Sequence, residues 1–167
     1  PIRKQEVQDE LWKRVLAGKI DCIGTDHSAY LHTEKAEGKD NIFKTPAGIT
    51  AMQLCYPVFF DEAVNKRGMS LEQFVHMSST AAAKLYDLYP KKGIIEIGSD
   101  ADLVIFDPAA KWTVENDKLF YLEKWTPLEG RTVTGRVDET IVRGKTVYRD
   151  GEIQMEGGYG QFVAALR

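Results

Sequence analysis

The chain reads Ile20-Asp21-Cys22-Ile23-Gly24-Thr25-Asp26-His27 shortly after Gly18. This apolar run contains β-branched residues and is too short for a helix, while glycine is a typical end for a preceding helix. It therefore predicts a buried β-strand that carries Asp26 and His27 at its C-terminal end. A parallel strand needs a neighbouring strand and a crossover helix, yet no second strand is predicted in the first half. We therefore expect residues 1–91 to be the end of a larger α/β fold.

Helices are predicted on both sides of this run. Apolar residues at helical spacing indicate helices over residues 4–17, 52–67, 70–77 and 81–86. Pro57 must start or kink the second of them, Ser70 and Gln73 form a capping box for the third, and Thr80 is the expected cap of the fourth. Residues 28–48 are polar, and a connection of that length is unusual unless it has a function. We therefore expect a functional loop there.

The second half of the chain changes to strands. Short β-rich runs cover residues 94–97, 103–106, 112–114, 140–143 and 145–148. The last two runs flank Gly144 closely enough to predict a tight hairpin, which makes Gly144-Lys145-Thr146 a turn rather than a phosphate-binding loop. Residues 154–167 are glycine-rich and predict no element, although Tyr159 and Phe162 are candidates for contact with a neighbouring subunit.

Composition narrows the class of partner. The 167 residues carry 22 Lys and Arg against 25 Asp and Glu, a net charge of -3, which argues against nucleic acid or an anionic membrane. We find no apolar run of about 20 residues and no secretory signal, so we expect a cytoplasmic protein. The two cysteines, Cys22 and Cys55, predict buried thiols rather than a disulfide framework or a Cys-rich zinc site.

Asp26 is the strongest candidate for chemistry. Burying a carboxylate at the end of a strand costs free energy unless the group is ion-paired, hydrogen-bonded or bound to a metal. In addition, catalytic groups lie at the C-terminal strand ends of (β/α)₈ barrels. Local sequence gives equal weight to an Asp26 that caps the following turn. A lone histidine such as His27 is more often a packing residue than a ligand. No chemical role is assigned to His32 or His76.

Gly24-Thr25-Asp26-His27 resembles the cyclic amidohydrolases, most closely their D-hydantoinase and dihydropyrimidinase branch. Further stretches that resemble this family are residues 33–40, 79–86, 88–93 and 98–108, the last of which marks the wider superfamily. The match is not uniform. Pro46-Ala47-Gly48 stands where hydantoinases usually have Asn-Gly, and Gly48-Ile49-Thr50 with Gln53 looks more like allantoinases.

The resemblance implies a fold and an assembly. It places the C-terminal part of a metal-dependent hydrolase (β/α)₈ TIM barrel in residues 1–91, strands of a small β-sandwich in residues 92–153 and a possible subunit-contact tail in residues 154–167. Such enzymes are homo-oligomers, tetramers or dimers, that open the ring of a small cyclic amide or ureide. Hydantoin, dihydropyrimidine and allantoin are all open as substrates.

The same resemblance implies a site with two divalent metal ions, usually zinc. Asp26 would be a metal ligand and would also carry a proton from hydroxide to the departing ring nitrogen. The backbone of Ala47 and Gly48 would hold the substrate ring. The remaining ligands would lie before Pro1, so these 167 residues alone should be inactive.

Three other interpretations are open. The first is an allantoinase or a dihydroorotase-like enzyme. The second is a non-catalytic scaffold, because the collapsin response mediator proteins share the fold but usually carry alanine at the position of Asp26; the aspartate here favours the enzyme. The third is a stand-alone domain, against which stands the predicted strand at residues 20–25, whose backbone groups would lack neighbours.

Overall fold

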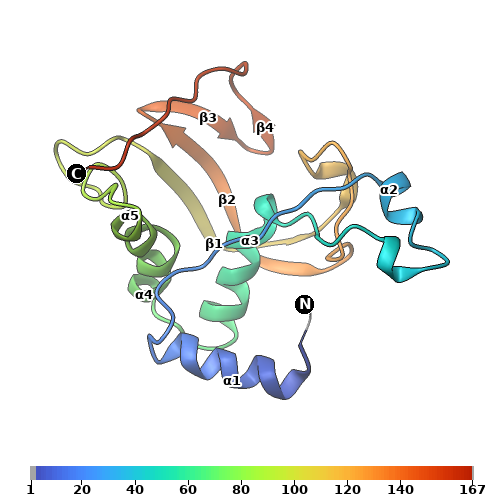
Figure 1. The fold of residues 1–167 in the computed structure, drawn as a ribbon. Helices are drawn as coiled ribbons and strands as arrows, with labels where there is room; N and C mark the ends of the chain where they lie inside the picture. The colour runs from blue at the N-terminus through green and yellow to red at the C-terminus, as the bar shows by residue number, and fades with distance from the viewer. Residues whose placement is uncertain (1–2, 167) are drawn as a thin grey trace.

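The computed structural model describes residues 3–166, which form a group of helices packed against one antiparallel sheet (Figure 1). The helices are α1 (Gln5–Leu16), α2 (His32–Ala36), α3 (Met52–Phe60), α4 (Leu71–Val75) and α5 (Ala81–Leu85). Turns of π-helix, η2 (Asp61–Asn65) and η3 (His76–Thr80), continue α3 and α4, and the two 3₁₀ turns are η1 (Ile42–Lys44) and η4 (Asn116–Lys118). None of these helices combines the length and the apolar character that crossing a membrane requires.

Helix α1 confirms the first predicted helix to within a residue at each end. It ends at Leu16 with Ala17 as the C-cap, and Gly18 follows with φ 66°, a left-handed conformation that glycine adopts without strain. Its apolar face contributes Val15, which is buried with Met69 and Met77 in the first hydrophobic cluster of the molecule. Val15 and the partly buried Trp12 hold α1 against this cluster, whereas Val7 and Leu11 on the same face are about half exposed.

Helix α3 and η2 join the helices to the sheet. Ala63 lies in the first cluster, whereas Leu54 lies in a second cluster with Val114 and Val133 from the sheet side. Pro57 is buried inside α3 and does not end it, because the helix runs on through η2. The continuous segment therefore fixes the first half of the chain relative to the second.

The sheet has the order β1-β2-β3-β4, with all neighbours antiparallel. Its strands are β1 (Leu103–Thr113), β2 (Thr132–Val142), β3 (Lys145–Arg149) and β4 (Glu152–Ile153). The predicted hairpin is confirmed: Arg143 and Gly144 have φ 45° and 78°, the signs of a type I′ turn. The predicted runs 103–106 and 112–114 belong to the single strand β1, except for Val114, which follows it. Within β1, Asp107 Oδ1 accepts from the backbone N–H groups of Ala109 and Ala110, where the register shifts.

Of the predicted strands, one is unpaired among the described residues and one is wrong. Residues 20–27 run extended past the helices but pair with no strand among the described residues; their backbone bonds include Ile23 N–H to the Met77 carbonyl at 3.4 Å. A strand exists only with a neighbour, and the described residues supply none there. Residues 94–97 form no strand but an irregular segment that leads into a turn at Ile97, and the Ile95 and Ile97 side chains are almost fully exposed.

Smaller features are confirmed in part. Ser70 Oγ accepts from Gln73 N–H at 3.1 Å as predicted, but the Gln73 side chain donates to the Val15 carbonyl instead of completing the capping box. Thr80 is no cap, because its hydroxyl donates to the Gly93 carbonyl. The two cysteines are free and only half-buried, so the expectation of fully buried thiols is wrong.

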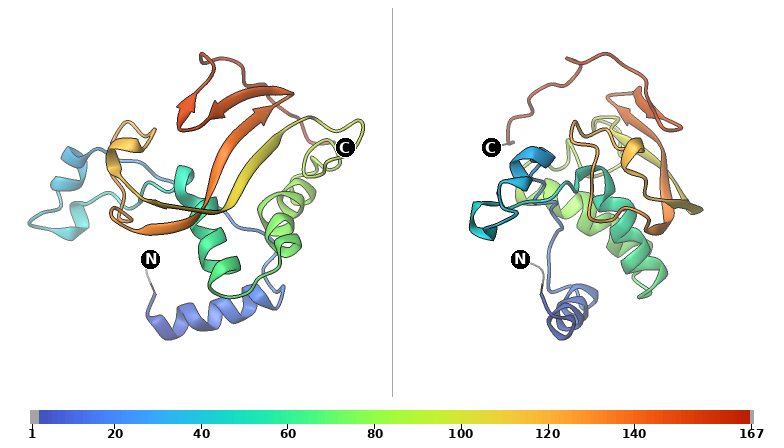
Figure 2. Two further views of the ribbon diagram at one scale, coloured as in Figure 1. Left: turned by 180° about the vertical axis from the view of Figure 1, so that it is seen from behind. Right: turned by 90° about the vertical axis from the view of Figure 1, so that its right-hand side faces the viewer.

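The C-terminal tail contains no helix or strand, as predicted, from residue 154 to residue 166. It runs back over the β3–β4 hairpin to the end of α5, where Leu166 N–H donates to the Asp87 carbonyl at 2.6 Å (Figure 2). The guanidinium carbon of Arg143 lies 4.3 Å from the centroid of the Tyr159 ring, so Tyr159 packs on the chain's own hairpin. Phe162 is 94% exposed.

Candidate functional site

Asp26 lies at the end of the extended segment with its side chain exposed. Its φ of 45° is in the left-handed region, which aspartate tolerates better than most residues and which is often found at functional positions. The next turn is closed by Thr25, whose hydroxyl oxygen accepts from the His27 amide at 3.2 Å. Among the described residues, the Asp26 carboxylate has no hydrogen-bond or ion-pair partner. The predicted cap of the following turn is therefore not made by Asp26.

His27 fixes the backbone next to Asp26. Its Nδ1 atom accepts from the backbone N–H groups of Ala51 and Met52, at 3.0 and 3.2 Å, where α3 begins. Nδ1 therefore carries no proton, and the ring occupies the place of a helix N-cap. The ring also lies 5.2 Å from that of Tyr121, whose hydroxyl accepts from Gln53 N–H at 2.6 Å. The expectation that His27 is a packing residue agrees with these contacts.

The polar loop is folded compactly around Lys35 in α2. The Lys35 ammonium donates to the carbonyls of Pro46 and Gly48, both at 2.6 Å. Ala47 lies between these two residues and is exposed, and within residues 3–166 its own N–H and carbonyl have no hydrogen-bond partner. The loop thus presents two free backbone groups at Ala47.

Gly48 brings this loop to the Asp26 segment. Ser28 N–H donates to the Ile49 carbonyl at 3.0 Å, and a Cβ added to Gly48 would lie 2.5 Å from Ser28 Cβ. Only a residue without a side chain permits this approach, and the φ of 131° also favours glycine. Two residues of chain span at most about 7 Å, so Asp26 lies close to this contact. Three predicted site residues, Asp26, Ala47 and Gly48, therefore belong to one region.

The segment between β1 and β2, residues 114–131, is hydrogen-bonded to the segments that carry Asp26, Ala47 and Gly48. Trp125 Nε1 donates to the Tyr30 carbonyl at 3.1 Å, and the hydroxyl of buried Thr50 donates to the Trp125 carbonyl. Gln53 Oε1 accepts from Phe120 N–H at 2.8 Å. Figure 1 shows this segment beside α2 and the loop. Residues from the sheet half of the chain thus hold the loop of the helical half.

The donor set for a metal is incomplete within the chain. No group of three His, Cys, Asp or Glu side chains in residues 3–166 is arranged to hold an ion. Asp26 fits one ligand position, since its carboxylate is exposed and unpaired, whereas His27 is committed to α3 through Nδ1. A metal site that included Asp26 would need further ligands from outside residues 3–166.

Comparisons with known proteins identify the family of the chain. The sequence profile of the Amidohydrolase family matches residues 3–147. The chain belongs to the amidohydrolase family. It is 36% identical over 163 residues to the L-hydantoinase of Paenarthrobacter aurescens, covering 98% of this chain and 36% of that protein. It is 40% identical over 168 residues to the allantoinase of Salmonella newport (strain SL254), covering 98% and 35%.

A solved structure shows the same fold. The dihydropyrimidinase from Brevibacillus agri NCHU1002 superimposes with a TM-score of 0.94 at 33% identity, covering all of this chain and 37% of that one. The amidohydrolase chain thus spans little more than a third of the length of the proteins that it matches. The fold class is therefore that of a part of a hydantoinase-type amidohydrolase, with one small antiparallel sheet.

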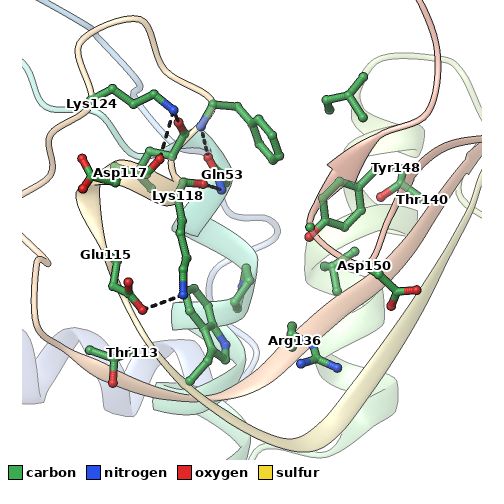
Figure 3. A pocket seen from close by; sticks show the side chains of 17 residues that line it. Gln53, Thr113, Glu115, Asp117, Lys118, Lys124, Arg136, Thr140, Tyr148 and Asp150 are labelled. Atoms are coloured by element: carbon green, nitrogen blue, oxygen red, sulfur yellow. Dashed lines mark hydrogen bonds and ion pairs between the residues drawn. The ribbon is translucent and has the colours of Figure 1, made fainter.

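A large cleft of this amidohydrolase chain lies elsewhere. It has a volume of about 820 Å³ and opens between the start of α3, η4 and the sheet (Figure 3). Lys118 at its wall pairs with Glu115 at 2.7 Å, and Lys124 donates to backbone carbonyls. These charges are satisfied by one another and by the backbone, and Asp26 does not line the cleft. It is therefore not the candidate site.

Sequence reasoning missed the residues that hold the site together. Lys35, Tyr121 and Trp125 carry no local signal of their role, because Tyr121 and Trp125 contact partners 68 to 95 positions away in the chain. Lys35 lies 11 and 13 positions from the carbonyls that it binds. Only its place in a polar loop of unusual length pointed to it.

Proposed function

We propose that these residues belong to an amidohydrolase that opens the ring amide of hydantoins or dihydropyrimidines. The observation that carries this proposal is the proximity of a free carboxylate, Asp26, to the free backbone groups of Ala47. A reaction at a ring amide needs both a group that moves a proton and donors or acceptors that hold the ring. Similarity to hydantoinases and dihydropyrimidinases supports the same class.

Asp26 has two roles in this proposal. With ligands from outside the described residues, it would hold one of two divalent ions, with zinc the proposed metal. Such ions supply hydroxide near neutral pH and polarise a carbonyl. The Asp26 carboxylate oxygen would take a proton from the water that adds its oxygen to the ring carbonyl carbon, and would deliver that proton to the ring nitrogen as the carbon–nitrogen bond breaks. The His27 contacts with α3 keep that carboxylate in place.

Ala47 and Gly48 would bind the ring from the other side. The free N–H and carbonyl of Ala47 can pair with a ring carbonyl and a ring N–H, as any peptide group can. A side chain at residue 47 does not enter these contacts, so alanine serves as well as asparagine. Allantoin is the second candidate substrate, since the Salmonella allantoinase is 40% identical and the residues after Gly48 look like those of allantoinases.

The organisation of the protein is proposed on the same grounds. Residues 1–91 would complete a TIM barrel, residues 92–153 would form part of a β-sandwich, and residues 154–167 would contact a neighbouring subunit. The separation of the two hydrophobic clusters supports the first boundary, although α3 contributes to both. Exposed apolar side chains such as Phe162 and Ile97 support a homo-oligomer, dimer or tetramer. A cytoplasmic location is proposed with it.

The test is the substitution Asp26→Asn in the complete zinc-loaded protein. Asparagine tolerates the left-handed backbone and keeps the size of the side chain, but it cannot carry the proton. We expect turnover of hydantoin, dihydrouracil or allantoin to fall by about 10²–10⁴ in a protein that still folds, as judged by cooperative thermal unfolding. Asp21→Asn, an exposed aspartate in the same segment, is the matched control. An Asp26→Asn protein with normal turnover would contradict the proposal, and a wild type inactive on every ring amide would favour the scaffold alternative.

A further inference from the structure

The environment of Lys35 contains more than two hydrogen bonds. The ammonium lies 5.2 Å from the ring centroid of Tyr30 and 5.9 Å from that of Trp125. Both distances are within the range of cation–π attraction. Tyr30 and Trp125 are themselves joined by the hydrogen bond from the indole N–H. The ammonium is therefore held from two aromatic sides, and its carbonyl partners are fixed with it.

The hydrogen bonds of Lys35 determine how the neighbouring peptide groups point. The carbonyl of Pro46 and the N–H of Ala47 belong to one planar trans peptide, so they point in opposite directions. Because the Pro46 carbonyl points at the Lys35 ammonium, the Ala47 N–H points away from it. The second bond, to the Gly48 carbonyl, fixes the chain on the other side of Ala47. One side chain thus orients the free donor from both sides.

We propose that Lys35 is a positioning residue for substrate binding, which orients the Ala47 N–H to donate to a carbonyl oxygen of the substrate ring. This inference rests on the proposed function. Within residues 3–166 the Lys35 ammonium contacts backbone carbonyls and two aromatic rings, so in this proposal it moves no proton. The donor that it orients is present before and during ring opening alike. Loss of the Lys35 side chain should therefore weaken substrate binding and leave the chemical step unchanged.

Three substitutions separate the charge from the shape of Lys35. Lys35→Met keeps most of the stem without donors, and Lys35→Gln keeps an amide donor without charge. Lys35→Arg keeps the charge, but its planar fork does not reproduce a compact ammonium between two carbonyls and two rings. Lys39→Met removes an exposed lysine from the same loop and is the matched control.

The measurement is the steady-state kinetics of the complete wild-type and variant proteins on the ring amide that the wild type opens best. For Lys35→Met we expect KM to rise about tenfold with kcat within about twofold, as expected for loss of interactions present equally in ground and transition states. Lys35→Gln and Lys35→Arg should fall between this value and wild type, and Lys39→Met should equal wild type. Thermal unfolding of each variant shows which of them fold, and any folded Lys35 variant suffices.

Chemical rescue adds an outcome that a general loss of structure would not give. In Lys35→Ala the missing group is propylammonium, so added propylammonium should lower KM again, while propanol should not. Unchanged KM in the folded variants, or a fall in kcat alone, would overturn the role of Lys35 while the proposed function stands. A wild type without activity on any ring amide would overturn both.

Discussion

Replacing His27 with alanine removes the ring that caps α3 and touches Tyr121. Two backbone donors, the N–H groups of Ala51 and Met52, lose their acceptor. Loss of an N-cap costs about 0.5–2 kcal/mol, and loss of an aromatic pair costs about 0.5–1.5 kcal/mol. Met52 is exposed, so water replaces the acceptor there and the full capping cost is not reached. We therefore expect a loss of about 1–3 kcal/mol in the free energy of unfolding.

The assay is urea unfolding at pH 7, followed by circular dichroism, with the midpoint and slope compared between variants. His27→Asn is the informative companion, because its Oδ1 takes the place of Nδ1 and accepts the same bonds, but it has no ring. It should recover about half of the loss, which is the capping contribution. His32→Ala serves as the control, since His32 is exposed and its ring contact is with Trp125 at 5.7 Å.

Two results would refute this reasoning. A His27→Ala protein within about 0.5 kcal/mol of wild type would show that the cap contributes nothing. Equal losses in His27→Ala and His27→Asn would show that the ring, and not its Nδ1 atom, stabilises the start of α3.

Two further predictions concern the joint between helices and sheet. Gly135→Ala should lower the free energy of unfolding by about 2–4 kcal/mol, because the φ of Gly135 is 114° and a Cβ would lie 2.7 Å from the Phe60 ring. The control Gly130→Ala, at φ 76° in open space, should lower it by only about 1 kcal/mol. Equal losses in urea unfolding would contradict the packing argument. Glu62→Gln should lower the free energy of unfolding by about 1–2 kcal/mol at pH 7. The partly exposed Glu62 carboxylate accepts ion-paired hydrogen bonds from Lys66, Arg67 and Arg131.

The Glu62 prediction includes a pH dependence. Burial alone raises the pKa of this carboxyl, but hydrogen bonds from Lys66 and Arg67 and the charge of Arg131 outweigh it and lower the pKa below its ordinary value of 4.5. A lowered folded-state pKa contributes stability above the unfolded value and loses it as the pH falls through the folded value. The difference between wild type and Glu62→Gln should therefore be full at pH 7 and shrink below about pH 4.5. A difference that is constant down to pH 3 would contradict it.

Local patterns in the sequence predicted elements whose cause is itself local. The α1 stripe, the Ser70 cap and the hairpin turn at Arg143-Gly144 depend on neighbours within a few positions, and the structure confirms each. The strand at residues 20–27 depends on a partner that the described residues do not contain, and it is not formed. Residues 94–97 have the composition of a strand, yet they form an irregular segment with Ile95 and Ile97 exposed.

The sequence by itself determined the family, through Gly24-Thr25-Asp26-His27 and the stretches beyond it, and it singled out Asp26, Ala47 and Gly48 as candidates. Only the tertiary structure decided how they meet. Gly48 packs on Ser28, Lys35 turns the peptide of Ala47, and His27 ties the Asp26 segment to α3. Contacts between distant segments leave no periodicity in the sequence, because they depend on how whole elements pack rather than on the spacing of residues along one element.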